Sequence, residues 1–318
     1  MKSSNIGGQA VMEGIMMRHK DKYSIAVRRP DNGIELKVED YKCTFGNAKF
    51  LRYPLIRGVV SFVDSLVVGT KCLMYSAEIA GDEEDEEEAQ KSAALSEEER
   101  AAKKAKEDKQ FKWLLYVTVA ISIIVSIAAF MLLPYALASL CRKVGASEFV
   151  VTVVEAFVKL ALFMGYMILI SRMKDIQRTF MYHGAEHKCI NCIEQGMDLT
   201  VENVRKSSRL HKRCGTSFLL IVMLISIVFF LFIRVDNRIL QLLLRLVLIP
   251  VIAGVSYEFI RLAGRSDHML VNLFSKPGLL LQRITTREPD DSMIEVGIAS
   301  VEAVFDWKAY VKEIREQA

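Results

Sequence analysis

A long apolar run is missing from the first fifty residues, and charged residues are spread through them. A cleavable secretory signal needs an apolar segment of about 7–15 residues near the start, so the sequence predicts no such signal. The chain also has little net charge, +4 over 318 residues. That small sum hides an uneven distribution, since residues 82–88 are all acidic and 172–213 are strongly basic.

Cysteine is scarce and scattered, with six residues at Cys43, Cys72, Cys141, Cys189, Cys192 and Cys214. We expect most of them to face the cytosol, where disulfides are rare, and therefore to be free thiols. Cys189, Cys192 and Cys214 are candidate metal ligands. An alternative is a closed structural zinc site built by Cys189, Cys192 and His187.

Long apolar runs are abundant in the rest of the chain, of which 52% is hydrophobic. Each of the runs 114–133 and 216–233 is long enough, or nearly so, to cross a hydrocarbon core of about 30 Å as a helix. We predict a mainly α-helical membrane protein with about four transmembrane helices and a small cytosolic α+β portion. The four spans are expected at about 113–133, 149–170, 216–233 and 239–257, within a membrane domain of residues 113–260.

Basic residues in the connections predict the orientation of these spans. Segment 171–215 holds nine Lys or Arg residues, whereas 141–148 and 234–238 hold two each. The positive-inside rule then places 171–215 and both termini in the cytosol. This rule accounts for the basic segment without a nucleic-acid partner, so membrane lipid is the expected surrounding and nucleic acid is not.

Three charged residues fall inside the predicted spans. Glu155 and Lys159 lie four residues apart in the second span, and Arg245 lies in the fourth. Charges in lipid are costly unless they are paired, so we expect Glu155 to pair with Lys159, Arg245 or both. A proton or ion path along these charges is the alternative.

Residues 1–80 are expected to form a cytosolic region with an N-terminal β-hairpin. Apolar and polar residues alternate over 23–29 and 34–41, on either side of Pro30-Asp31-Asn32-Gly33, which is a strong hairpin signal. Glycines at 7, 8 and 14 argue against a helix there and suit a tight turn, from which Glu13 and His19 could reach a site.

Residues 59–79 predict an amphipathic helix that lies on the membrane or packs on other helices. One stripe holds Val59, Val63, Leu66 and further apolar residues, and the opposite stripe holds Asp64 and Lys71. A fifth span is less favoured because those two charges would lie within the bilayer.

Two charged or polar segments complete the chain. Residues 81–112 predict a disordered acidic linker followed by a charged helix. Residues 261–318 predict a cytosolic segment with a short helix and turn over 277–289 and an amphipathic helix from about 291. That last helix either docks on the cytosolic region or binds a protein partner.

The stretch His183-Gly184-Ala185-Glu186-His187 carries the candidate chemistry. On a helix, positions 183 and 187 lie one turn apart, so two imidazoles face the same way. H-x-x-E-H is the inverted form of the zinc-hydrolase motif, with the carboxylate as general base. Gly184 counts against a helix, because glycine there costs about 1 kcal/mol relative to alanine. Two surface histidines in a polar loop are the simpler alternative.

A hydrolytic zinc needs three protein ligands and one open position. His183 and His187 supply two, and Glu186 is expected to be the general base. Glu258, on the fourth span, is the favoured third ligand, and His211 and Cys214 are the alternatives. The topology brings all of these to the cytosolic side.

In combination, these stretches resemble the YqhQ-like family of bacterial multi-pass membrane proteins, which carry the label of predicted metal-dependent enzymes. The matching segments are 7–18, 26–30, 182–188, 211–218 and 282–289. The resemblance implies a protein of the bacterial inner membrane and a divalent metal, and it supplies no substrate. Further site candidates from the matching segments are Glu13, Gln282, Thr285, Thr286 and Glu288.

Two functions follow from these expectations. The first is a zinc-type, metal-dependent hydrolase at the cytosolic membrane face that acts on a peptide or lipid-linked substrate. The second is a non-catalytic scaffold or regulator, in which the histidines are structural. A transporter is disfavoured because four spans without a broken-helix repeat do not match the usual transporter designs.

Overall fold

The computed structural model describes residues 3–46, 48–81, 113–114, 116–232, 235, 237–264, 266 and 268–317. By compactness it divides into two units, Met1–Ala80 with Met167–Ala318, and Gly81–Tyr166. The linker and charged helix expected over 82–112 lie outside the described residues. The four-part division expected from the sequence separates membrane from cytosolic segments and stays a prediction.

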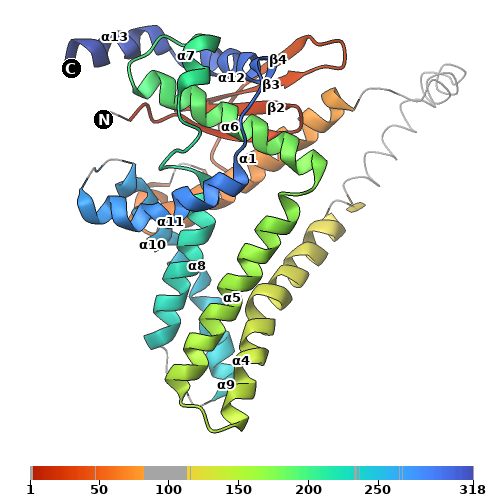
Figure 1. Ribbon diagram of the computed structural model, residues 1–318, viewed down its shortest axis with the longest axis vertical. Coiled ribbons are helices and arrows are strands. Elements are labelled where there is room, and N and C mark those ends of the chain that lie inside the picture. The colour runs from red at the N-terminus through yellow and green to blue at the C-terminus, as the bar shows by residue number, and fades with distance from the viewer. Residues whose placement is uncertain are drawn as a thin grey trace, which may run out of the picture. The chain divides into compact units, whose positions relative to one another are not determined.

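A four-stranded antiparallel sheet in the order β1-β2-β3-β4 stands at the N-terminal end of the chain (Figure 1). The strands are β1 Gly7–Val11, β2 Gly14–His19, β3 Lys22–Arg28 and β4 Ile34–Asp40. The predicted hairpin is confirmed as β3 and β4, which pair from Lys22↔Asp40 to Arg28↔Ile34. Asn32 in its turn has a φ of 64°, as the Asn-Gly turn chemistry favours.

The first hairpin, β1 and β2, was not predicted as strands. Its glycines conceal the alternation that would mark a strand, yet Gly14 is required there by close packing. A Cβ on Gly14 would lie 2.4 Å from the carbonyl oxygen of Ala26 on β3. Glu13 occupies the turn with a φ of 48°. The expected tight turn is therefore present, inside a β-hairpin.

Each face of the sheet has its own helical cover. Helix α1, Ile56–Ala80, covers one face, where Cys72 packs in a cluster with Val11, Tyr23 and Ile25. The opposite face packs on α6, Lys174–Glu194, and α12, Asp291–Val304 (Figure 1).

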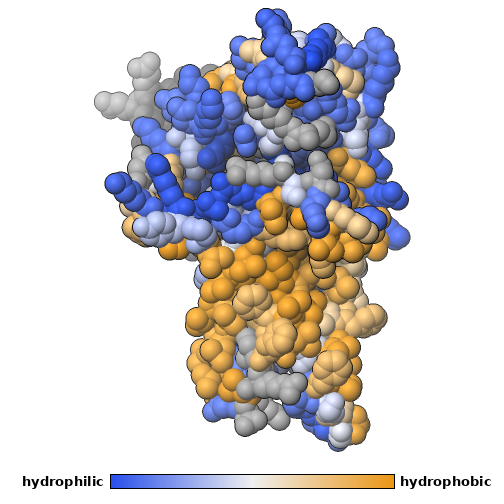
Figure 2. Space-filling view, turned by 90° about the vertical axis from the view of Figure 1, so that its left-hand side faces the viewer, coloured by the Kyte–Doolittle hydropathy of each residue, from blue (hydrophilic) through white to orange (hydrophobic). Residues whose placement is uncertain are grey.

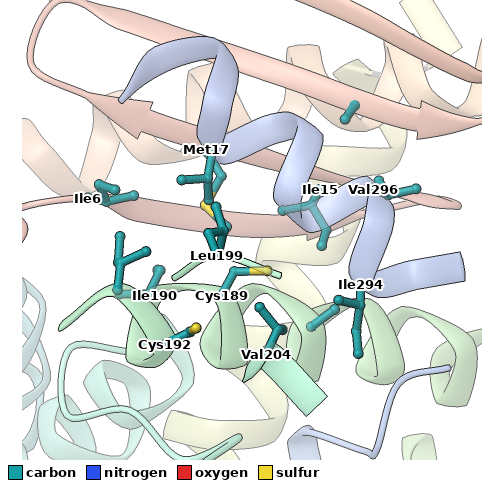
Figure 3. Packing of buried hydrophobic residues seen from close by; sticks show 14 of the residues in the cluster. Ile6, Ile15, Met17, Cys189, Ile190, Cys192, Leu199, Val204, Ile294 and Val296 are labelled. Carbon is teal, nitrogen blue, oxygen red and sulfur yellow. The ribbon is translucent and has the colours of Figure 1, made fainter. Parts of the chain in front are cut away.

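The larger core lies between the sheet, α6 and α12. Figure 3 shows Ile15 and Met17 of the sheet pointing toward Cys189 of α6 and Ile294 of α12. Because α12 completes this core, the docking expected for the C-terminal amphipathic helix is observed. It ends at Val304, and a separate helix α13, Trp307–Gln317, follows.

The burial pattern of β4 and α1 departs in part from a simple arrangement with apolar residues inside. Leu36 and Val38 of β4, expected on the buried face, are 45% and 46% exposed, because β4 is an edge strand and α12 lies mainly over β2 and β3. On α1, Asp64 is only 2% exposed, whereas Leu66 is 55% exposed. Asp64 accepts hydrogen bonds from the Tyr41 hydroxyl and from the Thr44 amide at 2.9 Å, so this residue of the polar stripe faces the protein, whereas Lys71 is exposed.

The apolar segments form long helices, and two of them, Tyr116–Lys143 and Ile239–Ala263, continue past the predicted ends at 133 and 257. In the first unit the apolar segments form α8 Gly215–Phe232 and the pair α9 Arg238–Val247 and α10 Ile249–Ala263, interrupted at Leu248 just before Pro250. The helix Tyr116–Lys143 contains a π-helical turn at Ala128–Leu132, labelled η2, and continues as α4, Leu133–Lys143. Helix α5, Glu148–Ile170, follows it.

Within the described part of the chain, five helices are long and apolar enough to cross a membrane, one more than the four spans expected: Ile56–Ala80, Tyr116–Lys143, Glu148–Ile170, Gly215–Phe232 and Ile239–Ala263. The molecule is thus mainly helical, with one small sheet. On the face drawn in Figure 2, hydrophobic side chains gather apart from the hydrophilic ones.

Two further helices help to position the residues of the candidate site. Helix α7, Val201–Lys206, follows α6 after a short turn and is capped by Thr200. Helix α11, Met269–Thr285, lies against α8 and ends where the segment 286–290 crosses to α12. It is longer than the short helix predicted over 277–289.

Candidate metal centre

The H-x-x-E-H stretch is helical and lies in the second half of α6. The rings of His183 and His187 are 4.4 Å apart between centroids. Each Nδ1 meets a backbone carbonyl, His183 that of Thr285 at 2.9 Å and His187 that of Arg209 at 2.7 Å. A carbonyl only accepts hydrogen bonds, so both Nδ1 atoms are protonated and donate, which leaves each Nε2 as the ligand atom.

Cys214 joins the two histidines from just before α8. Its Sγ lies 3.2 Å from Nε2 of His183, and the ligand atoms of His183, His187 and Cys214 all lie within 4.8 Å of one another. A tetrahedral zinc with bonds of about 2.1–2.3 Å separates its ligand atoms by roughly 3.5 Å. The three side chains therefore stand near the spacing that one zinc ion requires.

Polar residues of α6 hold the segment that carries Cys214. The Lys188 ammonium donates to the carbonyls of Arg205 and Ser207, both at 2.9 Å. The Asn191 amide donates to the carbonyls of Ser208 and Leu210 at 2.6 and 3.0 Å. These bonds tie the backbone after α7 to α6, so Cys214 arrives beside the histidines.

Glu186 is buried next to the three ligand side chains. Its Oε2 atom has no hydrogen-bond partner among the described residues, and burial raises the pKa of its carboxyl group against the lowering effect of His183 and His187. Strand β1 passes directly over it, since a Cβ on Gly8 would lie 2.7 Å from the carboxyl carbon. A carboxyl with a raised pKa and a free oxygen is suited to general acid–base chemistry.

The thiol of Cys214 and the imidazole of His183 each stabilise the charged form of the other. Burial opposes ionisation of both, but the neighbouring charges and the hydrogen bond between them prevail. The pKa of Cys214 falls well below its usual value, and that of His183 rises to about 9. A thiolate is the form of cysteine that ligates a metal.

Gly184 has a packing role that the sequence did not reveal. A Cβ at this position would lie 2.0 Å from the carbonyl oxygen of Arg287. The Arg287 amide donates to the carbonyl of Phe180 at 2.9 Å, so the segment after α11 lies directly on α6. This contact fixes Thr285, whose carbonyl orients His183.

Glu258, the favoured third ligand, is not part of the ligand group. Its Oε1 accepts from Nε of Arg57 at 2.6 Å, in a two-pronged ion pair with that guanidinium. Close packing of α1 on α10 sets this pairing, because Gly58 and Gly254 meet where the helices cross. Cys214, one of the two alternatives, lies with the two histidines instead.

His211, the other alternative, stands behind the ligand group. Its Nε2 is 3.4 Å from Glu194, and its ring centroid is 5.7 Å from that of His187. Despite its burial, the pKa of Glu194 falls to about 2 because of His211 and Arg213. Glu194 was missed, although it lies two helical turns after His187 on the same face of α6.

The remaining candidates support the centre without joining it. Gln282 clamps the His211 backbone, accepting from its amide at 2.8 Å and donating to its carbonyl at 2.7 Å. Thr286 donates its hydroxyl to the Gln282 carbonyl at 2.6 Å. Glu288 pairs with Lys188 at 2.9 Å.

Three other candidates lie apart from the ligand group. Glu13 pairs with Arg178 and accepts from the Tyr182 hydroxyl at 3.1 Å. Cys189 and Cys192 are buried in the apolar core (Figure 3), where burial raises the pKa of both thiols. The described group that could hold a metal includes neither thiol, so the alternative zinc site with His187 is not formed.

The three charges that were expected inside spans fall in different units. Glu155 and Lys159 are on α5 within Gly81–Tyr166, whereas Arg245 is on α9 in the other unit. The Arg245 guanidinium lies 4.8 Å from the ring centroid of Phe230. Pairing of Glu155 with Arg245 stays a prediction.

Comparison with known proteins gives a family and no activity. Residues 53–307 match the model of a family described as a protein of unknown function (DUF1385). An uncharacterized protein of Bacillus subtilis strain 168, YqhQ, is 36% identical over 299 residues, which cover 92% of this chain and 90% of that protein. No solved structure matches the chain.

Proposed function

Since the chain belongs to the DUF1385 family of proteins of unknown function, we propose its activity from its own site: a metal-dependent hydrolase at the cytosolic face of a membrane. In this proposal His183, His187 and Cys214 hold one divalent ion, and Glu186 moves the proton. The observation that carries it is the gathering of three ligand atoms within 4.8 Å beside a buried carboxyl oxygen that has no partner among the described residues.

The donor set suits zinc. Two imidazole nitrogens and one thiolate are ligands that Zn²⁺ accepts readily, whereas Mg²⁺ and Ca²⁺ prefer oxygen. Both histidines are oriented by carbonyls behind them, as metal-ligating histidines usually are. Three protein ligands leave one position open, which is the pattern of catalytic rather than structural zinc sites.

The chain's own residues supply the rest of the chemistry. A divalent ion, when bound, would contribute Lewis-acid chemistry, polarising a substrate oxygen and making water more acidic. Glu186 accepts a proton at its free Oε2 and returns it to the leaving group. Thr216 places its hydroxyl 3.1 Å from Sγ of Cys214 and 3.2 Å from the Thr285 hydroxyl, which steadies the thiolate.

The location at a bacterial inner membrane is part of the proposal. Segments from both ends of the chain, β2 and α12, share one core with α6 of the basic segment 171–215. Segments that share a core lie on one side of a membrane, and the positive-inside rule makes that side the cytosol. The substrate class that fits a site at this boundary is a peptide or lipid-linked molecule.

Helix α1 is better placed along the membrane surface than across the bilayer. It packs on the sheet from Asp64 to Ile79, so its two ends belong to the same body. Its outward face carries Phe62, Leu66 and Leu73, which are 37%, 55% and 47% exposed. An apolar face backed by a folded domain is typical of an interfacial helix.

Metal analysis tests the proposal. Protein purified without chelator should contain about one divalent ion per chain, measured by elemental mass spectrometry, and the His183→Ala, His187→Ala double variant should contain almost none. A Cys189→Ala variant is the matched control and should keep its metal. If the wild-type protein contains no stoichiometric metal, the proposal is refuted.

A second variant separates catalysis from a structural metal. Glu186→Gln should keep the ion and lose the cellular role of the protein, scored by complementation of a deletion strain. If Glu186→Gln retains both metal and complementation, the scaffold alternative replaces the hydrolase.

A further inference from the structure

A basic cavity of about 570 Å³ lies in the first unit, apart from the metal ligands. Five arginines line it, contributed by β2, the segment before α1, the start of α1, the segment before Cys214 and the end of α10. They are Arg18, Arg52, Arg57, Arg213 and Arg261. The single acid in the lining is Asp64.

Acidic partners neutralise only part of this charge. Arg57 pairs with Glu258, and Arg213 pairs with Glu194. The Asp64 carboxylate is occupied by the Tyr41 hydroxyl and the Thr44 amide.

The other three arginines make no ion pair among the described residues, although Arg261 lies near enough to Glu258 to help lower the pKa of that carboxyl group. The Arg18 guanidinium stacks on the ring of Tyr41, 3.2 Å from its centroid. Arg52 is exposed and Arg261 is half-buried, and neither makes an ion pair within the described part of the chain. Several guanidinium groups that face one cavity repel each other, and an anion bound between them removes that repulsion.

Arginine favours one class of anion. The planar guanidinium matches the oxygens of a phosphate group with two parallel hydrogen bonds. The volume lies within the range of about 300–1,000 Å³ that is usual for small-molecule sites. Ser61 and Tyr257 add hydroxyl groups to the lining.

The cavity lies beside apolar helices. Arg57 and Ser61 are near the start of α1, and Arg261 is near the end of α10, and both helices are apolar enough for membrane contact. Basic pockets at helix ends on the cytosolic side are typical sites for anionic lipid headgroups. We propose that this cavity binds a phosphate group, carried by a lipid headgroup or free in solution.

A binding experiment with three ligands tests this inference. Full-length protein in neutral detergent is titrated with inorganic phosphate, with short-chain phosphatidic acid and with short-chain phosphatidylcholine, and the rise in melting temperature is recorded. If phosphatidic acid raises the melting temperature more than phosphatidylcholine does, the ligand is a lipid headgroup. If inorganic phosphate raises the melting temperature as much as phosphatidic acid does, the ligand is the free ion.

Paired variants assign the response to the cavity. Arg52→Gln with Arg261→Gln removes two arginines that make no ion pair among the described residues, so the fold should survive and binding should weaken roughly tenfold or more. Arg172→Gln with Arg283→Gln removes the same charge from exposed positions outside the cavity lining and should bind like wild type.

Two results would overturn the inference: no phosphate ligand stabilises the wild type, or both double variants weaken binding equally. The outcome is independent of the metal centre, since no metal ligand lines the cavity. Loss of metal with intact phosphate binding would therefore refute the proposed hydrolase alone.

Discussion

At the scale of single residues, the proposed centre depends on Cys214, which the sequence offered only as an alternative third ligand. H-x-x-E-H gave His183, Glu186 and His187 by helical spacing, but spacing says nothing of a residue 27 positions later. The Sγ of Cys214 is 3.2 Å from His183 only because the backbone after α7 is tied to α6. Its lowered pKa follows from that proximity.

Alkylation should report on Cys214 directly. A thiolate bound to metal reacts slowly, whereas the freed thiolate reacts fast because its pKa is low. We expect iodoacetamide at pH 7 to modify Cys214 slowly in protein as purified and at least about tenfold faster after chelation. The measurement is peptide mass spectrometry of each cysteine over time.

Cys43 supplies an internal standard for this experiment. It is half-buried, outside the metal group, and burial raises its pKa, so its slow rate should not change with chelator. Equal rates for Cys214 with and without chelator would contradict this prediction.

At the scale of elements, glycines allow backbones to approach where the site is assembled. Gly184 admits the segment after α11 onto α6, and Gly8 lets β1 pass over Glu186. Gly58 and Gly254 bring α1 onto α10. Each glycine weakens local helix or strand preference, and each permits a contact between elements.

Gly184→Ala should therefore destabilise the protein, although alanine is the better helix former. The new Cβ would meet the Arg287 carbonyl at 2.0 Å, and overpacking of this kind costs about 1–3 kcal/mol. We expect a lower melting temperature in detergent and weaker metal retention, because Thr285 no longer orients His183.

Gly165 is the matched control for that substitution. It lies in α5, and a Cβ added at this position would have no atom within 4 Å among the described residues. Gly165→Ala should therefore be neutral or stabilising by up to about 1 kcal/mol. Equal effects at the two positions would refute the packing role of Gly184.

At the scale of the whole molecule, the proposed topology puts the sheet, α6 and α12 together on the cytosolic side. The short connection between α4 and α5, residues 144–147, then lies on the opposite side of the membrane. Two native cysteines report on the two sides: Cys141 at the end of α4 and Cys43 after β4, both half-buried.

Right-side-out membrane vesicles should distinguish these two thiols. A membrane-impermeant maleimide should label Cys141 in intact vesicles and Cys43 only after the vesicles are opened. A Cys141→Ala variant should lose the label seen in intact vesicles, which assigns that label to Cys141. The reverse order of labelling would invert the topology and place the proposed metal centre outside the cell.

The sequence by itself determined the elements whose signals are local. Long apolar runs fix the helices from 148 to 170 and from 215 to 232, because burying a helix in lipid or protein needs only length and hydrophobicity. Alternation around Asn32-Gly33 fixes the β3–β4 hairpin, and helical spacing pairs His183 with His187. The glycine-rich first hairpin gave no such signal, because its strands depend on contacts with their neighbours.

Tertiary structure decided which partners those elements meet. It placed Cys214 rather than Glu258 beside the histidines. The close packing of α1 on α10 at Gly58 and Gly254 pairs Glu258 with Arg57. The tertiary structure also turned Asp64 of α1 inward and gathered arginines from distant segments around one cavity. Such choices depend on distances between residues far apart in the chain, and local periodicity carries no information about those distances.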